Sequence, residues 1–374
     1  MRIKKVRSKK EMKAFVRMPE HLHGQSDCFV PPIWMDEQNA YYGKTNPILS
    51  NSEFELFLVL DDSGSAVGRT LAYVDFNHNK YYNTDIGFFG AFECIDDNQA
   101  ASLLVIAAER WLKAKGMHTI RGPIHPVAEN WGFLLEDYDT PPIYMSPWNP
   151  EYYHRFFTEA GYEKTKDLLV YEADMGKGYE IPGRFDGFME RYLKRNPGIT
   201  IRQLNMRDLK RDAKAILDIT NTALGDNWGF VPLELSVMED MLKKLKLIVD
   251  IDAVWFVEDK GKTVGYCLGF PDINILLKKI NGNLLPFGFI KLLMGLKKLR
   301  DYRLYGIAVL PEYQGKALDA LMYIKMYEKL APKKIRLEAN YILEDNLNIK
   351  NALLRLGMTY CKSYRIYDKQ LAKG

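Results

Sequence analysis

A short polar loop that leads into an apolar helical pattern is the part of the sequence best suited to chemistry. The residues Gln314-Gly315-Lys316-Ala317 open a predicted helix, Gln314–Leu330. The first turn of a helix carries backbone N–H groups without intrahelical partners and the positive end of the helix dipole, and both attract phosphate. Lys316 adds a compact positive charge at the same place. The pattern therefore predicts a site for a phosphate-bearing ligand.

The elements that must position this loop alternate between strands and helices along the whole chain. Runs rich in β-branched and aromatic residues predict strands, and apolar residues at helical spacing predict helices. The first half gives strands Glu55–Leu60, Ala66–Asp75, Ile86–Glu93 and Thr119–Ile124, and helices Gln99–Lys115 and Pro150–Ala160. The second half gives strands Ala253–Glu258, Thr263–Phe270, Arg303–Leu310, Lys334–Ala339 and Tyr360–Asp368, and the additional helix Asn346–Leu356. This order predicts an α/β (α+β) fold of mixed, twisted sheets flanked by helices.

The two halves repeat one another. Val67-Gly68 recurs as Val264-Gly265, and Asp75-x-Asn77 recurs as Asp272-x-Asn274, each 197 positions later. A fixed offset that preserves the order of elements indicates two copies of one structural unit. We therefore predict an N-terminal lobe of residues 1–181, a helical linker of residues 182–197 and a C-terminal lobe of residues 198–374.

The composition is that of a globular protein with a sizeable core. Of 374 residues, 47% are hydrophobic and 27% are charged, and the four cysteines are far apart, which excludes a disordered chain or a disulfide scaffold. A net charge of +4 gives no reason to expect a nucleic-acid partner. The histidines show no metal-ligand spacing, so we expect no metal. Without a signal peptide or a run of about 18 apolar residues, we expect a cytoplasmic protein.

The positive charges are concentrated in two segments. Residues 1–17 carry eight basic side chains against Glu11, and residues 276–303 carry seven against Asp301, so these segments sum to +13 and the remainder to −9. In the second segment Phe289, Leu292, Leu293, Leu296 and Leu299 fall on one face of a predicted helix. Such a basic amphipathic helix is typical of peripheral contact with an anionic membrane, here the inner membrane surface. The alternative is a helix that packs its leucines on the core.

The order of elements in each half resembles that of the GNAT acyltransferases. In the second half, residues 307–317 (IAVLPEYQGKA) resemble the strand and pyrophosphate loop of that fold, and residues 346–357 resemble its closing helix. The resemblance implies that this strand offers a backbone N–H to the oxyanion of a thioester under attack. The residues that it implies for binding the thioester are Ile307, Ala308, Val309, Gln314, Gly315, Lys316 and Ala317.

The first half departs from this pattern. Its corresponding loop, residues 93–97 (ECIDD), is acidic and would repel a pyrophosphate. We therefore predict that the second lobe holds the thioester. The position of the tyrosine that often serves as the general acid holds Phe157 in the first half and Leu353 in the second, so any acid must come from elsewhere.

Longer phrases carry a more specific resemblance. Val30-Pro31-Pro32, residues 76–79 (FNHN) and Arg121-Gly122-Pro123 in the first half, with residues 228–232 (WGFVP) and 364–367 (YRIY) in the second, are similar to the bacterial YghO-like proteins. These are two-lobed GNAT relatives that include bacterial ceramide synthases. The resemblance implies amide formation between a long acyl chain, carried as an acyl-CoA or acyl carrier protein thioester, and the amine of a sphingoid-type lipid.

Amide formation requires a base, because the pKa of an amine in solution is about 10. Glu338 lies near the end of the last core strand of the second lobe, where this fold opens its active site. Glu129 and His125 follow the matching strand of the first lobe. We treat all three as candidate catalytic residues, since a desolvated carboxylate or imidazole can accept the proton. The alternative for each is an ordinary structural side chain.

The tetrapeptide Asn-Trp-Gly-Phe occurs twice, at residues 130–133 and 227–230. Its glycine permits close backbone approach, and its tryptophan offers an apolar wall with one N–H donor. We predict that Asn130, Trp131, Asn227 and Trp228 bind the substrate in a cleft between the lobes. The alternative is that both segments are turns packed in the core.

Together these features favour an acyl-CoA-dependent N-acyltransferase that acts on a small-molecule or lipid amine. A catalytically inactive GNAT-like protein that binds acyl-CoA, lipid or a protein partner is the alternative. A third interpretation, an aminoacyl-tRNA-dependent peptide-bridge transferase, predicts a coiled-coil arm, and the sequence has no heptad run to form one.

Overall fold

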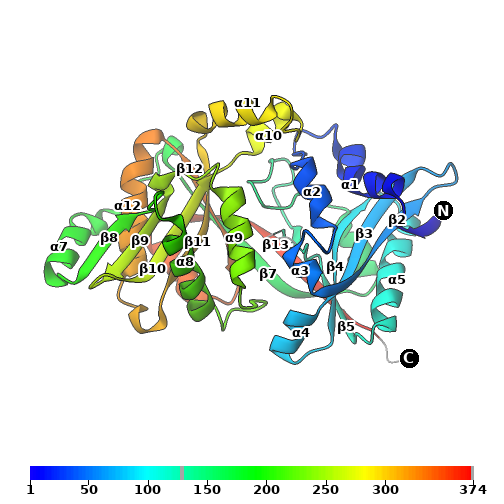
Figure 1. Ribbon diagram of the computed structural model, residues 1–374, viewed down its shortest axis with the longest axis horizontal. Helices are drawn as coiled ribbons and strands as arrows, with labels where there is room; N and C mark the ends of the chain where they lie inside the picture. Colours follow the sequence, from blue (N-terminus) through cyan, green and yellow to red (C-terminus); the bar gives the residue numbers. More distant parts are fainter. Residues whose placement is uncertain (127–129, 372–374) are drawn as a thin grey trace. The chain divides into compact units, whose positions relative to one another are not determined.

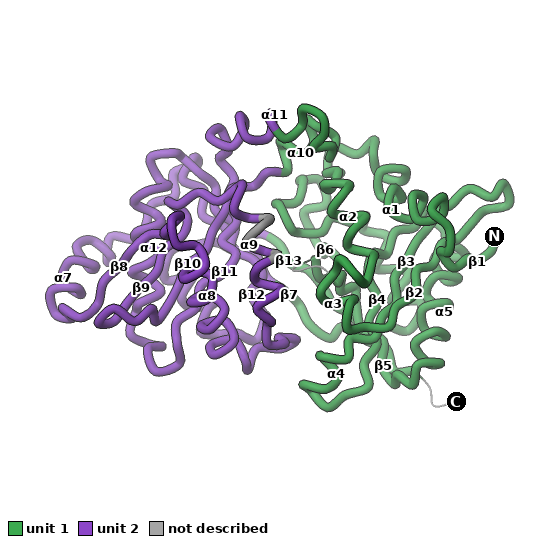
Figure 2. The backbone as a smooth tube through the Cα atoms, viewed as in Figure 1, with its two compact units in different colours: residues 1–168, 274–289, 362–374 green, residues 169–273, 290–361 purple. Residues whose placement is uncertain are grey.

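The chain forms two compact units in the computed structural model, which describes residues 1–126 and 130–371 apart from the side chains of residues 240 and 242–244 (Figures 1 and 2). The first unit comprises residues 1–168, 274–289 and 362–374, and the second comprises residues 169–273 and 290–361. These bounds differ from those of the predicted lobes, because the last strand of each repeat changes unit along its length and residues 274–289 belong to the first unit. Strand β7 (Glu163–Asp174) enters the second unit after Leu168, and β13 (Thr359–Gln370) returns to the first after Cys361.

The first unit is built on a mixed sheet in the order β1-β2-β3-β4-β5-β13, in which β4 and β5 pair in parallel. Its remaining strands are β1 (Arg2–Lys5), β2 (Ser52–Leu60), β3 (Ala66–Asp75), β4 (Ile86–Cys94), β5 (Thr119–Gly122) and β6 (Phe133–Leu134). Its helices are α1 (Lys9–His23), α2 (Trp34–Ala40), α3 (Pro47–Ser50), α4 (Phe76–Tyr82), α5 (Asn98–Ala114), α6 (Tyr153–Glu159) and α10 (Asn274–Ile280). Helix α5 packs on β2 and β3 and buries Leu104, Ala108 and Leu112.

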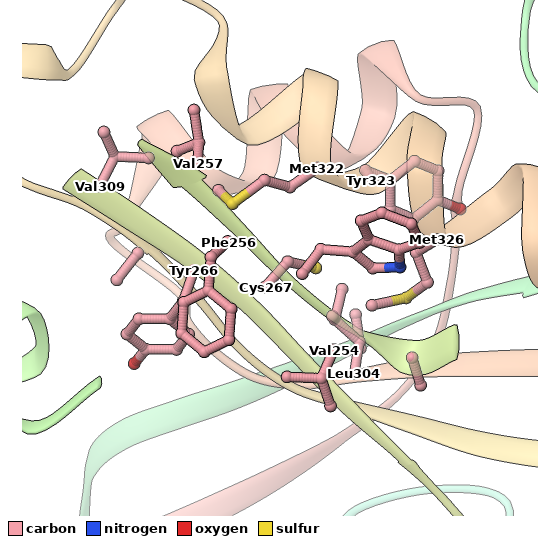
Figure 3. Close-up of a cluster of buried hydrophobic side chains, with 14 of the residues drawn as sticks. Val254, Phe256, Val257, Tyr266, Cys267, Leu304, Val309, Met322, Tyr323 and Met326 are labelled. Carbon is pink, nitrogen blue, oxygen red and sulfur yellow. The ribbon is translucent and has the colours of Figure 1, made fainter. Parts of the chain in front are cut away.

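The second unit repeats this plan with the order β7-β12-β11-β10-β9-β8, in which β11 and β12 pair in parallel. Its strands are β8 (Ile199–Gln203), β9 (Val254–Asp259), β10 (Lys262–Pro271), β11 (Asp301–Val309) and β12 (Arg336–Leu343). Its helices are α7 (Phe188–Arg195), α8 (Leu209–Ala223), α9 (Leu235–Leu245), α12 (Leu318–Leu330) and α13 (Leu347–Arg355), and α11 (Gly288–Gly295) begins in the first unit and ends here. Figure 3 shows the core, where Met322 and Met326 of α12 cover Cys267 on one face of the sheet while Phe256 and Tyr266 point to the other.

The predicted fold class is confirmed, and most predicted elements occur within a few residues of their expected bounds. The strand expected over Ala66–Asp75 has those bounds, and the helix expected over Gln99–Lys115 is α5. The helix expected from Gln314 begins four residues later, at Leu318. Gly315 has φ of 73° and Ala317 has φ of 57°, and such left-handed residues cannot continue a right-handed helix.

The prediction of one amphipathic helix over residues 276–303 is wrong. The segment contains α10, α11, a short 3-10 turn at Leu296–Lys298 and the start of β11. Helix α10 ends at two left-handed residues, Asn281 with φ of 48° and Gly282 with φ of 67°, which is a common way for a helix to end. Pro286 then lacks the N–H that a continuing helix would need. In the described residues no helix is both long and apolar enough to cross a membrane.

The C-terminal strand completes the sheet of the first unit. Tyr367 pairs with Gly122 and Asp368 with Arg121 in the antiparallel register of β13 on β5. The Arg121 guanidinium donates two hydrogen bonds to the Asp368 carboxylate at 2.8 and 2.7 Å. Tyr367 is 2% exposed and belongs to the same hydrophobic core as Phe157. The last strand of the second repeat is thus a structural part of the first unit.

Replacing Tyr367 with Ala should therefore destabilise the first unit by about 3–5 kcal/mol, the usual range for truncating a buried aromatic residue. The change is measured by urea denaturation together with hydrogen exchange at residues 119–122, which should accelerate. Tyr360, on the same strand, is 45% exposed, and its replacement with Ala is the control, expected to cost less than about 1 kcal/mol. Equal effects of the two substitutions would contradict this role of β13.

Candidate functional site

The pairing between strands β11 and β12 ends before either strand does. They pair from Asp301 with Arg336 as far as Leu304 with Ala339, whereas β11 continues to Val309 and β12 to Leu343. The register of β11 with β10 shifts at the same point, so that Tyr305 is an extra residue. Such a bulge bends a strand away from its neighbour. In the described residues β12 does not pair with β11 beyond Leu304, so the edge of β11 from Gly306 onward can face a ligand.

Three of the residues predicted to bind the thioester lie on this part of β11. Ile307, Ala308 and Val309 pair with Cys267, Tyr266 and Gly265 of β10 on their other edge, which fixes the strand in place. Tyr305, Gly306 and Ile307 are only half-buried. Backbone N–H groups at such an edge can donate hydrogen bonds to a carbonyl or oxyanion oxygen.

The other four predicted residues form the loop between β11 and α12. A Cβ atom placed on Gly315 would meet no atom within 4 Å, and Lys316 is exposed. Ala317 is the N-cap of α12 and provides no side-chain cap, so the first N–H groups of this helix remain available to an anion. The amide of Gln314 donates to the Val309 carbonyl at 3.3 Å and closes the loop on its strand.

Lys316 makes no ion pair with any residue that the structure describes. Its Nζ lies 4.7 Å from the centre of the Tyr313 ring, and the Tyr313 hydroxyl donates to Asp259 at 2.8 Å. A cation–π contact at the surface is weak enough to be given up to a phosphate. The loop therefore fits a phosphate-bearing ligand.

Asp319 lies in the first turn of α12, but its negative charge does not offset the positive charge of this loop. By helical spacing it shares a face with Met322 and Tyr323, which are 0% and 1% exposed and pack on the sheet. Burial, and then the charge of Asp319, raise the pKa of the Cys267 thiol on β10. The Asp319 carboxylate therefore acts on the sheet side of the helix.

The corresponding place in the first unit is closed. β4 and β5 pair up to Phe88 with Arg121, and the backbone then stays close, with Ile124 N–H donating to the Phe89 carbonyl at 2.8 Å. A Cβ atom on Gly90 would lie 2.5 Å from the Ile124 carbonyl oxygen, so the strands touch where β11 and β12 part. Helix α5 is capped by its own Asp97, whose side chain accepts from Ala100 N–H. The carboxylate at the start of this helix disfavours a phosphate there.

Glu338 lies on β12, next to the parting of the strands, and is 0% exposed. Its carboxylate accepts hydrogen bonds from Arg336 at 3.3 Å and Asn340 at 3.2 Å. Burial opposes the positive charge of Arg336, but the carboxylates of Glu338 and Asp301 outweigh it and raise the pKa of Arg336. Glu338 is thus held in a buried charged cluster on one face of β12.

Sequence reasoning missed the aromatic and cationic residues around this cluster. Arg303 is 0% exposed, lies opposite Glu338 in the ladder, and has its guanidinium 5.6 Å from the ring centre of Tyr305 and 5.3 Å from that of Tyr341. The two tyrosines flank the parting, one on each strand. The one signal in the sequence was Arg303, a charged residue at the start of the strand expected over Arg303–Leu310. A buried arginine needs partners, so such a residue indicates a polar cluster.

His125 lies in a buried polar cluster of the first unit. Its Nε2 is 2.9 Å from the hydroxyl of Tyr41, which donates to Glu37 at 2.6 Å. Because that hydroxyl has a single proton, His125 must donate through Nε2, which leaves the lone pair on Nδ1. In the described part of the chain this Nδ1 is buried without a hydrogen-bond partner. Burial lowers the pKa of His125 to about 4, so it is neutral at pH 7.

Charged residues surround this imidazole. Arg69, 3% exposed, donates to the Phe15 carbonyl at 2.8 Å and lies 3.4 Å from Glu37 and 3.9 Å from Glu93. Burial opposes the charge of Glu93, but His23 at 3.0 Å outweighs it and holds the pKa of Glu93 below its usual range. The partners come from distant segments, so no spacing in the sequence could have indicated them.

The remaining predicted site residues do not all belong to one unit. Glu129 lies outside the described residues. Asn130 and Trp131 belong to the first unit, where Trp131 forms an isolated bridge with Ile124 and the Oδ1 atom of Asn130 is buried.

Asn227 and Trp228 belong to the second unit, in a turn where Phe230 N–H donates to the Asn227 carbonyl at 3.1 Å. Gly132 and Gly229 both have positive φ, of 80° and 74°. Substrate binding by these four residues stays a prediction.

The architecture is that of two GNAT units in tandem. A tandem GNAT protein from the clavulanic acid biosynthesis pathway matches with a TM-score of 0.56 over 100% of this chain and 99% of that one, at 9% identity. A GCN5-related N-acetyltransferase from Sphaerobacter thermophilus matches with a TM-score of 0.50 over 85% of this chain and 81% of that one, at 12% identity. At these identities the likeness concerns the fold.

Curated sequences define the family. Protein YghO of Escherichia coli (strain K12) is 32% identical over 372 residues, which cover 97% of this chain and 94% of that protein. The bacterial ceramide synthase of Caulobacter vibrioides is 30% identical over 377 residues, which cover 98% of this chain and 96% of that protein. The chain therefore belongs to the bacterial YghO-like family of tandem GNAT-like proteins, as its sequence predicted. No protein-family model matches it.

Replacing Lys316 with Ala should raise the Kd for acyl-CoA about tenfold, because one charge-assisted phosphate contact is lost. Binding of the same acyl chain on pantetheine, which lacks the pyrophosphate, should stay unchanged, and calorimetry measures both. Lys329, exposed at the other end of α12, provides the control substitution to Ala. An equal loss for both thioesters would show that Lys316 does not contact phosphate.

The low pKa of His125 also predicts acid sensitivity. A neutral buried histidine binds fewer protons than the unfolded chain, so stability falls as the pH drops from 6.5 toward 4, by about 2 kcal/mol at pH 5. His125→Asn should lessen this loss of unfolding free energy between pH 7.5 and 5, and His21→Asn, at an exposed position, should not. His78, whose pKa burial also lowers to about 4, accounts for part of the remaining loss. An unchanged pH dependence in the His125 variant would refute the neutral buried state.

Proposed function

We propose that this protein is an N-acyltransferase that transfers a long acyl chain from an acyl thioester to the amine of a lipid-like substrate. The observation that carries the proposal is the parting of β11 and β12 beside a helix N-terminus without a side-chain cap. An acyl thioester needs hydrogen-bond donors at its carbonyl oxygen and a cationic site for its phosphates. In this proposal one strand–loop–helix segment of the second unit supplies both.

The acyl donor is proposed to bind the second unit. The edge of β11 from Gly306 to Val309 would supply backbone N–H groups that stabilise the oxyanion formed when the amine attacks the thioester carbonyl. The loop of Gly315 and Lys316 with the start of α12 holds the pyrophosphate of acyl-CoA or the phosphate of a carrier-protein thioester. The closed strands and the Asp97 cap of the first unit argue against a second donor site there.

The amine must lose a proton before or during the attack. Glu338 is the favoured base, because it lies on the strand that leaves β11 at the proposed thioester position. A carboxylate in a buried site can accept the proton directly or through a water molecule. His125 is the alternative, since its Nδ1 lone pair is not engaged by the described residues. Glu129 remains a third candidate.

A lipid amine is the favoured acceptor. The support is the 30% identity, over 96% of its length, to a protein named bacterial ceramide synthase, whose name denotes N-acylation of a sphingoid base. The coarser assignment, an N-acyltransferase of the GNAT type, is also supported by the fold of the structural relatives. Acyl-CoAs of graded length distinguish the acyl chain that is transferred.

One observation favours the alternative, a binding protein without catalysis. The positions at which GNAT enzymes often have the acidic tyrosine hold Phe157 and Leu353, which are 1% and 2% exposed and belong to the cores of the two units. Tyr305 and Tyr341, which flank the parting of the strands, provide hydroxyl groups that can take this role in an active enzyme.

The decisive assay mixes the protein with acyl-CoAs of graded chain length and a panel of amines that includes a sphingoid base. Release of free thiol and formation of the amide are measured together. Turnover with a long-chain acyl-CoA and a lipid amine is the expected result. Saturable binding of acyl-CoA without turnover for any pair would contradict the enzyme and favour the binding protein.

Replacing Glu338 with Gln should lower kcat by about 100-fold or more, since general bases usually contribute at least this factor, while the Kd for acyl-CoA stays the same. Glu172→Gln is the matched control, because Glu172 also lies 3.3 Å from Arg336 but on β7. Both variants are compared by their unfolding midpoints. Unchanged turnover in the Glu338 variant, with a large loss in His125→Asn, would transfer the role to His125.

A further inference from the structure

The helix α11 and the residues on either side of it (residues 284–298, the α11 segment) expose several large apolar side chains. Leu285 is 79% exposed, Phe287 is 67% exposed and Met294 is 75% exposed. These are the three most exposed large apolar side chains in the described part of the protein. Soluble surfaces rarely concentrate such residues unless they contact a partner or a membrane.

The apolar residues share one face of the segment. Phe287, Ile290 and Met294 follow helical spacing, and Ile290 is 53% exposed. Leu292, on the other side of the helix, is 4% exposed and anchors α11 to the protein. The helix is thus fixed by one apolar face and presents a second one outward.

The chain on either side of this face is positively charged. Residues 273–300 contain no Asp or Glu and six basic side chains, all of them exposed: Lys278, Lys279, Lys291, Lys297, Lys298 and Arg300. Protruding apolar groups flanked by lysines match the two layers of an anionic lipid surface, in which phosphates lie above the acyl chains. A protein groove would complement the apolar face but would not account for six exposed cations in 28 residues without one Asp or Glu.

We propose that the α11 segment binds an anionic phospholipid surface. Leu285, Phe287 and Met294 enter the boundary between headgroups and acyl chains, and the lysines contact the phosphates. The sequence predicts a basic helix lying flat on the membrane over residues 276–303; the structure instead supports an apolar turn and one short helix that insert. The inference concerns binding alone and does not depend on the proposed acyl transfer.

The test is sedimentation of the full-length protein with vesicles, in the absence of any acyl donor or amine. Vesicles of phosphatidylcholine with phosphatidylglycerol are compared with vesicles of phosphatidylcholine alone. We expect the protein to bind the anionic vesicles, and we expect the double variants Leu285→Ser/Phe287→Ser and Lys291→Glu/Lys298→Glu each to lower the partition coefficient about tenfold or more. Binding should also weaken at high salt.

Two controls match these changes. Leu347→Ser/Leu354→Ser alters residues of α13 that are 62% and 54% exposed, and Lys194→Glu/Lys210→Glu reverses two exposed charges outside the segment. Both should bind like the wild type, and all variants must keep the wild-type unfolding midpoint. Equal binding to neutral vesicles, no binding, or equal losses in the controls would overturn the proposal.

The proposal would also be overturned if a second copy of the chain covers the α11 segment. Light scattering would then show a dimer in the absence of lipid that Leu285→Ser/Phe287→Ser converts to a monomer. None of these measurements uses turnover, so an inactive protein that binds anionic vesicles would refute the proposed function and leave this inference standing.

Discussion

The hydrogen-bond ladder between β11 and β12 ends at Leu304 and Ala339 although both strands continue, and the candidate site depends on this interruption. Backbone N–H groups inside a sheet are normally paired, so a strand edge becomes available to a ligand only where a neighbour leaves. The bulge at Tyr305 bends β11 at that point. The same strand leads through a short loop into α12, so the proposed oxyanion site and the proposed phosphate site follow one another along one segment of the second unit.

The first unit has the same order of elements but a different use for them. Gly90 and Gly122 allow the backbone after β5 to stay against β4, because a Cβ atom on either would meet backbone oxygen at 2.5 Å or less. Asp97 satisfies the start of α5 with a carboxylate of its own. In place of an anion site, this unit has a polar cluster in which Arg69 and His125 are buried and Glu93 is half-buried. The two units therefore differ at the place where the second one has its candidate site.

The sequence was sufficient for features that local patterns determine. The strand over Ala66–Asp75 and the helix α5 follow from periodicity. That the acidic loop after β4 leaves the thioester to the second lobe stays a prediction. The helix boundary at Leu318 was missed because an alanine at φ of 57° has no signature in composition. The crossing of β13 into the first unit and the partners of His125 depend on pairing between residues far apart in the chain, which periodicity cannot report. The single helix over residues 276–303 failed because two left-handed residues ended α10 early.

Hydrogen exchange with and without a saturating long-chain acyl-CoA tests the central claim most directly, because it reports which strand and which helix start meet the donor. The account predicts slower exchange at residues 305–309 and 315–321 in the second unit, with no change at residues 95–101 around the start of α5. Protection at residues 95–101, or at neither segment while acyl-CoA is bound, would contradict it.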